Sequence, residues 1–214
     1  MARLRKAAKI WRRPEARSAA ESALIADDGS LFAIDPRAIF GNDAPLEIEL
    51  GAGKGDFIVA RAQEFPGRNF LAAELSGVVS RMLAVRCGRA GLANLRVVRM
   101  DARTLVNLML ERESVAAYHI YFPDPWPKER HHKHRLFTPY FVTSLCRTLR
   151  SHGMLFVATD VAEYAREIFA MLDLSGLALL QEPVPGRDQT GFGRRFTAIG
   201  KPVHSRAYRK SRIP

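Results

Sequence analysis

From about residue 46 onward, short apolar runs alternate with longer amphipathic stretches along the chain. This alternation is typical of parallel strands joined by crossover helices, and most of the runs are apolar enough to be buried on both faces of a sheet. We therefore expect an α/β protein with a Rossmann-like, mostly parallel, doubly wound sheet. The strands are expected at residues 46–50, 69–75, 95–99, 116–122 and 153–159, with weaker ones at 177–181 and 195–199.

The stretches between these runs have the apolar spacing of helices. One of them opens with Thr138 as an N-cap residue followed by a proline, a common helix start. Residues 1–45 have weak periodicity and many charges, so we expect a basic N-terminal arm that orders late or on binding. The remainder, 46–214, is expected to be a single domain with a basic C-terminal tail. The helices are expected at 56–64, 78–90, 138–149 and from after Asp160 to about 174.

The formal net charge of +11 is concentrated at the two ends of the chain. Residues 1–17 contain seven Lys/Arg and one acid, and residues 187–214 contain eight Lys/Arg and one acid, whereas the body between them is close to neutral. Basic segments on both sides of a neutral body favour a polyanionic partner, because phosphate contacts release counterions. Nucleic acid is the first candidate, and a solubilising role for the charges is the alternative.

Length and composition exclude several classes of protein. A chain of 214 residues buries enough surface to fold without a metal or a disulfide, and we expect its two cysteines, Cys87 and Cys146, to be buried and reduced. No apolar run approaches the roughly 20 residues that span a bilayer, and the N-terminus lacks the apolar segment of a signal peptide. We expect a soluble, cytoplasmic protein with no membrane partner; the oligomeric state stays open.

A glycine-rich turn follows the first expected strand, in the sequence Glu49-Leu50-Gly51-Ala52-Gly53-Lys54-Gly55. Glycines allow the backbone to approach a ligand closely at a helix N-terminus, although a tight turn without a ligand is the alternative reading. Acidic residues stand at or just after the ends of four expected strands. Because these strand ends meet where open α/β sheets bind ligands, we expect the four carboxylates to line one crevice. They are Glu49, Glu74, Asp101 and Asp124.

The choice of cofactor depends on the charge of this turn. An acid after the second strand, such as Glu74, can accept both hydroxyls of a ribose, in a nicotinamide dinucleotide as well as in S-adenosylmethionine. Glu49 stands two residues before the first glycine and would repel a pyrophosphate, whereas it suits the ammonium and sulfonium groups of S-adenosylmethionine. We therefore expect S-adenosylmethionine, held by Glu49, Gly51, Gly53, Glu74, Asp101 and Asp124.

The run Phe122-Pro123-Asp124-Pro125-Trp126-Pro127-Lys128, followed by Arg130-His131, closely resembles the tRNA (guanine-N7-)-methyltransferase family. This resemblance implies a class I methyltransferase that transfers a methyl group from S-adenosylmethionine to N7 of a guanine in tRNA. It also implies that Asp124 is the active-site residue. The implied contacts to the RNA substrate are Lys128, Asp160 and Thr190.

The residues of this loop support the same chemistry. Its prolines stiffen the segment that carries Asp124. Trp126 offers either a stacking face for a base or an anchor in the core, and of the two we expect the core anchor. Four basic residues next to the carboxylates are expected to contact phosphates: Lys128, Arg130, Lys133 and Arg135. The histidines of the loop have no cysteine or carboxylate partners at ligand spacing, so we expect no metal. Guanine N7 is a neutral nucleophile, so catalysis requires positioning rather than a general base.

Three features depart from the family pattern. His134-Arg135 stands where the family has a basic pair, the N-terminal segment with Trp11 is short, and Thr190-Gly191-Phe192-Gly193 lacks the final glutamate of the Thr-x-Phe/Tyr-Glu signature. Either a nearby acid, Glu182 or Asp188, replaces that glutamate, or guanine is not the acceptor. A methyltransferase acting on a small heteroaromatic molecule and a non-catalytic RNA-binding relative are the two alternatives.

Overall fold

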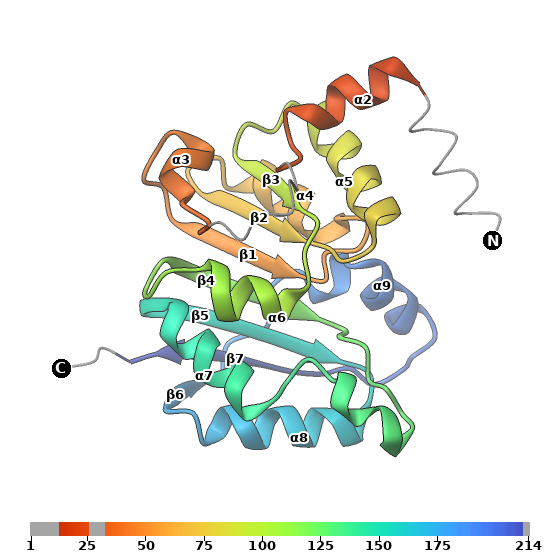
Figure 1. Ribbon diagram of the computed structural model, residues 1–214. Helices are drawn as coiled ribbons and strands as arrows, with labels where there is room; N and C mark the ends of the chain where they lie inside the picture. Colours follow the sequence, from red (N-terminus) through yellow and green to blue (C-terminus); the bar gives the residue numbers. More distant parts are fainter. Residues whose placement is uncertain (1–12, 26–32, 212–214) are drawn as a thin grey trace. The chain divides into compact units, whose positions relative to one another are not determined.

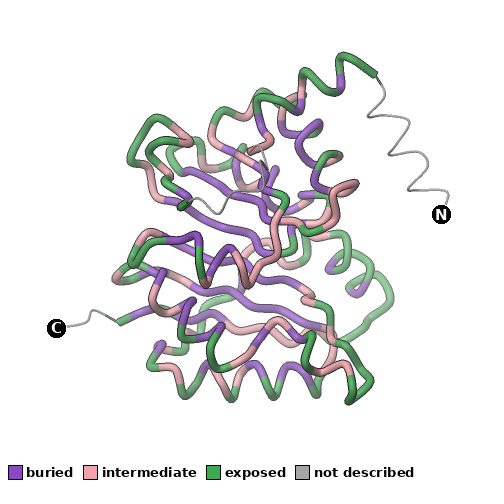
Figure 2. Tube along the Cα trace, viewed as in Figure 1, coloured by how far each residue is buried: buried purple, intermediate pink, exposed green. Residues whose placement is uncertain are grey.

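Seven strands form in the described residues, 13–25 and 33–211, of the computed structural model. The first twelve residues of the expected basic arm and the last three of the expected tail lie outside these ranges. The chain divides into two units, Met1–Ala102 and Arg103–Pro214, which are described in turn. In both units the strands are largely buried and the helices alternate between buried and exposed faces, as Figure 2 shows.

The first unit contains three parallel strands in the order β3-β2-β1 (Figure 1). Each pair of strands is connected by a helix, as a parallel arrangement requires. In the register, Glu49 and Leu50 of β1 lie beside Ala72 and Ala73 of β2, so the carboxyl ends of these two strands are level. The elements are α2 (Pro14–Glu21), α3 (Pro36–Phe40), β1 (Leu46–Leu50), α4 (Asp56–Glu64), β2 (Asn69–Ala73), α5 (Gly77–Arg89) and β3 (Leu95–Val98).

Helix α2 packs against α5, although the expected arm was predicted to order late or on binding. Small residues explain the packing: Ala16 and Ala20 are buried, and an added Cβ on Gly88 of α5 would overlap the backbone of Ala19. After α2 the chain forms a bridge between Leu24 and a residue of β3. The described start of the chain is therefore held by close contact between alanine and glycine backbones, which hydrophobic periodicity does not reveal.

The second unit has the strand order β4-β5-β7-β6, with β4 and β5 parallel and the other two pairs antiparallel. Helix α8 contacts β5, β6, β7 and α7, so α7 and α8 pack together beside the sheet (Figure 1). The elements after the short α6 (Ala102–Thr104) are η1 (Leu105–Met109), β4 (Val115–Tyr121), η2 (Glu129–His134), α7 (Pro139–Thr148), β5 (Leu149–Thr159), α8 (Ala162–Asp173), β6 (Leu177–Leu180), η3 (Arg187–Gln189), α9 (Gly191–Ala198) and β7 (His204–Lys210).

The strand expected at 195–199 is wrong. These residues belong to helix α9 and its C-terminus, because Thr190 caps the helix by accepting a hydrogen bond from the backbone of Gly193 (2.8 Å). The last strand is instead β7, which pairs with both β5 and β6. The expected basic tail therefore contains a strand with neighbours on both sides.

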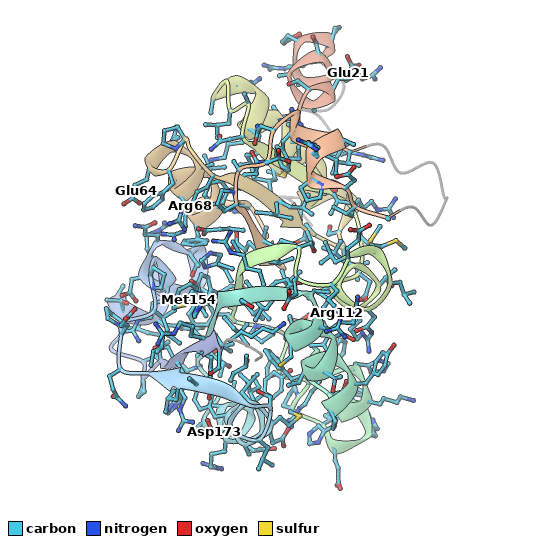
Figure 3. The ribbon with its side chains drawn as sticks, turned by 90° about the vertical axis from the view of Figure 1, so that its left-hand side faces the viewer. Glu21, Glu64, Arg68, Arg112, Met154 and Asp173 are labelled. Atoms are coloured by element: carbon cyan, nitrogen blue, oxygen red, sulfur yellow. The ribbon has the colours of Figure 1, made fainter. Side chains whose placement is uncertain are left out.

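The charges of β7 are largely paired within the unit. Lys210 is buried and donates to the carbonyl of Leu149 (2.7 Å), and Arg206 donates to Asp173 (2.7 Å), which Figure 3 labels at the end of α8. Arg206 and Lys210 therefore stabilise the fold, whereas Arg209 of the same strand is exposed to solvent.

Two further expectations concern the cysteines and the membrane. Cys87 is buried, and burial raises the pKa of its thiol to about 12, whereas Cys146 is only half-buried. Both cysteines are free thiols.

Within residues 13–25 and 33–211 no helix is long and apolar enough to cross a bilayer.

Candidate functional site

The glycine turn after β1 has three residues in the left-handed region. The φ angles of Gly51, Gly53 and Gly55 are 79°, 55° and 71°, a conformation that glycine adopts without steric cost. A Cβ added to Gly51 or Gly53 would meet no atom within 4 Å, so these two positions border open space. A Cβ on Gly55 would lie 2.1 Å from the side chain of Leu83, so Gly55 serves the packing of α4 against α5.

Glu74 is held between this turn and the start of α5. Its Oε2 accepts a hydrogen bond from the backbone N–H of Gly53 (2.9 Å), and its Oε1 accepts one from the backbone N–H of Ser76 (2.8 Å). A carboxylate has about four lone-pair positions, so two oxygens fixed in this way can each accept one more hydrogen bond. The side chain is therefore oriented beside the glycine turn with capacity for a pair of hydroxyl donors.

Glu49 is a buried carboxylate with an unsatisfied oxygen. The residue is 4% exposed, and its Oε2 has no hydrogen-bond partner among the described residues. Burial raises its pKa well above the ordinary value, the backbone N–H of Ile58 lowers it, and the charges of Asp56 and Glu74 raise it further. An orphaned buried acceptor is costly, and a cationic ligand group would remove the cost.

We predict that Glu49→Gln stabilises the ligand-free protein at neutral pH. Because the folded-state pKa is raised, the contribution of Glu49 to stability is present below its ordinary pKa of 4.5 and is lost as pH rises through the folded value. Glutamine has the same shape and no charge. The thermal midpoint of the variant should therefore exceed that of the wild type, and the difference should grow as pH rises from 4.5 through the folded-state pKa of Glu49. Thermal unfolding of both proteins from pH 4 upward measures this difference.

The same substitution should weaken S-adenosylmethionine or S-adenosylhomocysteine binding, measured by calorimetry, by about ten- to one-hundredfold, because a hydrogen bond to a charged group is lost. Glu64→Gln, at the exposed end of α4 (labelled in Figure 3), is the matched control and should change neither quantity. A Glu49→Gln variant that is less stable than the wild type at pH 8 would contradict the prediction.

Asp101 is the third of the predicted donor-binding acids in the first unit. It follows β3 and is half-buried. The first unit thus brings Glu74 into contact with Gly53 and sets Glu49 within electrostatic range of Glu74. These features fit three parts of S-adenosylmethionine. The oriented oxygens of Glu74 fit its ribose, the orphaned carboxylate of Glu49 fits its ammonium group, and the open glycine turn leaves room for its methionine moiety.

The loop after β4 carries Asp124 in the second unit. Phe122 and Trp126 have φ angles of 53° and 43°, which are costly for residues other than glycine and are typical of functional sites. The backbone N–H of Phe122 donates to the carbonyl of Ala158 (2.7 Å), which fixes the start of the loop. Asp124 is exposed and, within the described ranges, has no ion-pair partner for its carboxylate.

Arg135 is buried against protein acceptors, whereas the predicted phosphate contact requires an exposed guanidinium. Its side chain is only 4% exposed and donates to Glu167 (2.5 Å), to Glu163 (3.4 Å) and to the carbonyl of Pro125 (2.9 Å). The guanidinium also lies 4.9 Å from the ring centre of Tyr164. Arg135 therefore ties the Asp124 loop to α8.

Trp126 is likewise not a core anchor. It is 36% exposed and packs against the rings of His131 (5.9 Å between centroids) and His134 (5.1 Å). Lys128, Arg130 and Lys133 are exposed around η2. No group of three or more metal-ligating side chains occurs in the part of the chain that the structure describes.

Of the three expected substrate residues, Lys128 directly precedes η2, and the other two are connected to α9 or to the segment that follows it. Asp160, just after β5, forms an ion pair with Lys201, whose Nζ lies 4.7 Å from the ring centre of Phe196. The hydroxyl of Thr190 donates to the carbonyl of Arg187 (2.9 Å) and accepts from Gly193, so it is engaged in the helix cap.

Gly193 is enclosed by the preceding turn. A Cβ there would lie 2.0 Å from the carbonyl oxygen of Arg187 and 3.0 Å from the Cα of Asp188. A glutamate at this position would displace η3, so the missing carboxylate cannot simply be restored. Asp188, one of the two acids suggested as its replacement, lies directly beside this position.

The comparisons with known proteins agree with the motif. A family model described as "Putative methyltransferase" matches residues 43–205. The chain is 39% identical to the tRNA (guanine-N(7)-)-methyltransferase of Syntrophotalea carbinolica, over 83% of this chain and 79% of that protein. The chain belongs to this methyltransferase family. The protein of the same name from Leifsonia xyli subsp. xyli is 39% identical over 85% of this chain and 82% of its own.

The fold of this family member also has solved counterparts. The 16S rRNA methyltransferase KamB matches with a TM-score of 0.60 and 17% identity, over 82% of this chain and 94% of that chain. The expected α/β, Rossmann-like class is confirmed. Sequence reasoning missed Lys201, which pairs with Asp160, and it missed the structural role of Arg135, which pairs with Glu163 and Glu167. In both cases the partners are far apart in the sequence.

Proposed function

We propose that this protein transfers a methyl group from S-adenosylmethionine to N7 of a guanine in tRNA. The observation that carries the proposal is its 39% identity, over 83% of the chain, to a relative named for that reaction. The geometry of the first unit supports the methyl donor, because a buried carboxylate with an unsatisfied oxygen suits an ammonium group and repels a pyrophosphate. A nicotinamide dinucleotide therefore fits this turn less well.

Five residues of the first unit hold the donor in this proposal. Glu74 accepts the ribose hydroxyls with its oriented oxygens, Glu49 receives the ammonium group, and the turn at Gly51 and Gly53 leaves room for the ligand. Asp101, three residues after β3, can accept a hydrogen bond from the adenine. When bound, S-adenosylmethionine supplies an electrophilic methyl group on a sulfonium.

Asp124 is the proposed catalytic residue. Guanine N7 carries a lone pair, so no side chain has to remove a proton before methyl transfer. Positive charge develops on the purine as the new bond forms, and a carboxylate near the ring stabilises it. The stiff, strained loop holds Asp124 in place, and positioning of this kind supplies up to roughly 7 to 11 kcal/mol in well-oriented reactions.

The RNA is proposed to bind through the basic residues near this loop and through the N-terminal arm. Lys128, Arg130 and Lys133 are exposed beside Asp124 and contact phosphates. Asp160 and Thr190 contribute from the region of α9, with Lys201 positioning Asp160. Residues 1–12 carry five Lys/Arg and no acid, which adds sequence-independent affinity for phosphates.

The test is methyl transfer to unmodified tRNA transcripts by the full-length protein with labelled S-adenosylmethionine. We expect incorporation as N7-methylguanosine and none into transcripts made with 7-deazaguanosine, which lack the nucleophilic nitrogen. Normal binding of S-adenosylmethionine without transfer to tRNA would favour the small heteroaromatic substrate, and tRNA binding without affinity for the methyl donor would favour a non-catalytic relative.

A further inference from the structure

Three phenylalanine rings meet where α9 packs against the Asp124 loop. Phe192 and Phe196 of α9 are stacked, with centroids 5.9 Å apart and an interplanar angle of 23°. Phe122 packs against both rings, at 6.1 Å from Phe192 and 5.4 Å from Phe196. Phe196 is buried, whereas Phe192 is 55% exposed. The trio therefore presents one aromatic ring to solvent on a rigid base.

The trio is connected to both acids proposed for the acceptor side of the site. Phe122 stands two residues before Asp124, so their Cα atoms are at most about 7 Å apart. At the other end, Lys201 lies over the ring of Phe196 while it pairs with Asp160. The exposed ring of Phe192 thus belongs to the same small region as the proposed catalytic loop.

We propose that Phe192 stacks on an unpaired nucleobase of the RNA substrate. An enzyme that modifies a base must take it out of its helical stack, and the exposed π-face of an aromatic side chain replaces the lost stacking. Charge selects RNA over a protein partner, because the exposed Arg194 and Arg195 follow Phe192 on α9. This inference rests on the proposed function and adds a specific contact to it.

The test measures the Kd of tRNA for variants of Phe192. Phe192→Ala should raise it about 5- to 150-fold, the range for loss of one base–aromatic stack, and Phe192→Leu should behave alike because leucine has no π-face. Phe192→Tyr and Phe192→Trp should stay near the wild type. Since stacking is not electrostatic, the slope of log Kd against log salt should not change in Phe192→Ala.

Two controls separate stacking from damage to the fold. Tyr140→Ala removes another exposed aromatic ring of the same unit, on α7, and should leave the Kd of tRNA unchanged. Thermal unfolding and S-adenosylhomocysteine affinity should be normal in all Phe192 variants. If the wild type methylates tRNA but Phe192→Ala or Phe192→Leu binds tRNA with wild-type affinity, the stacking proposal is overturned and the proposed function stands. Absence of transfer by the wild type would instead overturn the proposed function.

Discussion

Replacing Asp124 with asparagine is expected to lower kcat for tRNA methylation by about 10²- to 10³-fold. The substitution keeps the size of the side chain and removes the negative charge that stabilises the developing cation on the purine, an effect of the magnitude found when one electrostatic stabiliser is removed. Asp124 is exposed on a loop that other residues fix, so the fold should not change. Steady-state kinetics with saturating S-adenosylmethionine measure the effect.

The kinetic parameters distinguish two roles for Asp124. If the carboxylate stabilises charge in the transition state, kcat falls and the KM for tRNA changes little; if it mainly orients guanine, KM rises instead. Glu129→Gln is the matched control, since Glu129 is also an exposed acid of this segment and should retain wild-type kinetics. An Asp124→Asn variant within a few-fold of wild-type kcat would refute a catalytic role for the carboxylate.

The parallel strands of the fold were predictable because most of their positions are apolar, as burial on both faces of a sheet favours. β1 and β2, for example, are buried at every position. β7 was not predictable, because its sequence, HSRAYRK, is mostly polar. Its buried Lys210 is held by residues far away in the chain, since it donates to Glu113 and to the carbonyl of Leu149, which are 97 and 61 positions away. Periodicity has no access to such pairings.

The residues proposed for the methyl donor were predicted in more detail than those proposed for the acceptor. Strand ends and a glycine turn are local features, so sequence alone identified Glu49 and Glu74 as neighbours of the turn. The orphaned oxygen of Glu49 adds a physical reason for a cationic ligand that the sequence only suggested. On the acceptor side, Asp160 and Lys201 are 41 positions apart, and their pairing depends on how α9 folds back.

Arginine and lysine residues around η2 look alike in sequence, yet the structure gives them opposite roles. Lys133 is exposed, whereas Arg135 is buried against the carboxylates of α8 and the carbonyl of Pro125. The partners of Arg135 lie 28 and 32 residues further along the chain. The run of basic residues predicted a single phosphate-binding cluster. In the structure Lys128, Arg130 and Lys133 are exposed cations, whereas Arg135 is a buried guanidinium with a structural role.

Arg135→Ala is accordingly expected to lower the free energy of unfolding by about 3 kcal/mol. Removing one partner of a buried ion pair costs about 3 to 5 kcal/mol, and the lower end applies because Glu163 and Glu167 are partly exposed to solvent. The carbonyl of Pro125 also loses its donor. Arg135→Lys should recover only part of the loss, since one ammonium cannot reproduce the planar fork that serves three acceptors. Urea denaturation of the full-length protein measures both.

Lys133→Ala supplies the matched comparison two positions away. It should change stability by less than about 0.5 kcal/mol, as expected for an exposed side chain. It should weaken tRNA binding and reduce the slope of log Kd against log salt by nearly one unit, because one phosphate contact is lost. Arg135→Ala, assayed under conditions where it remains folded, should keep the wild-type slope, since its guanidinium already faces protein carboxylates. A flattened slope in Arg135→Ala, together with unchanged stability, would return Arg135 to the phosphate-binding cluster.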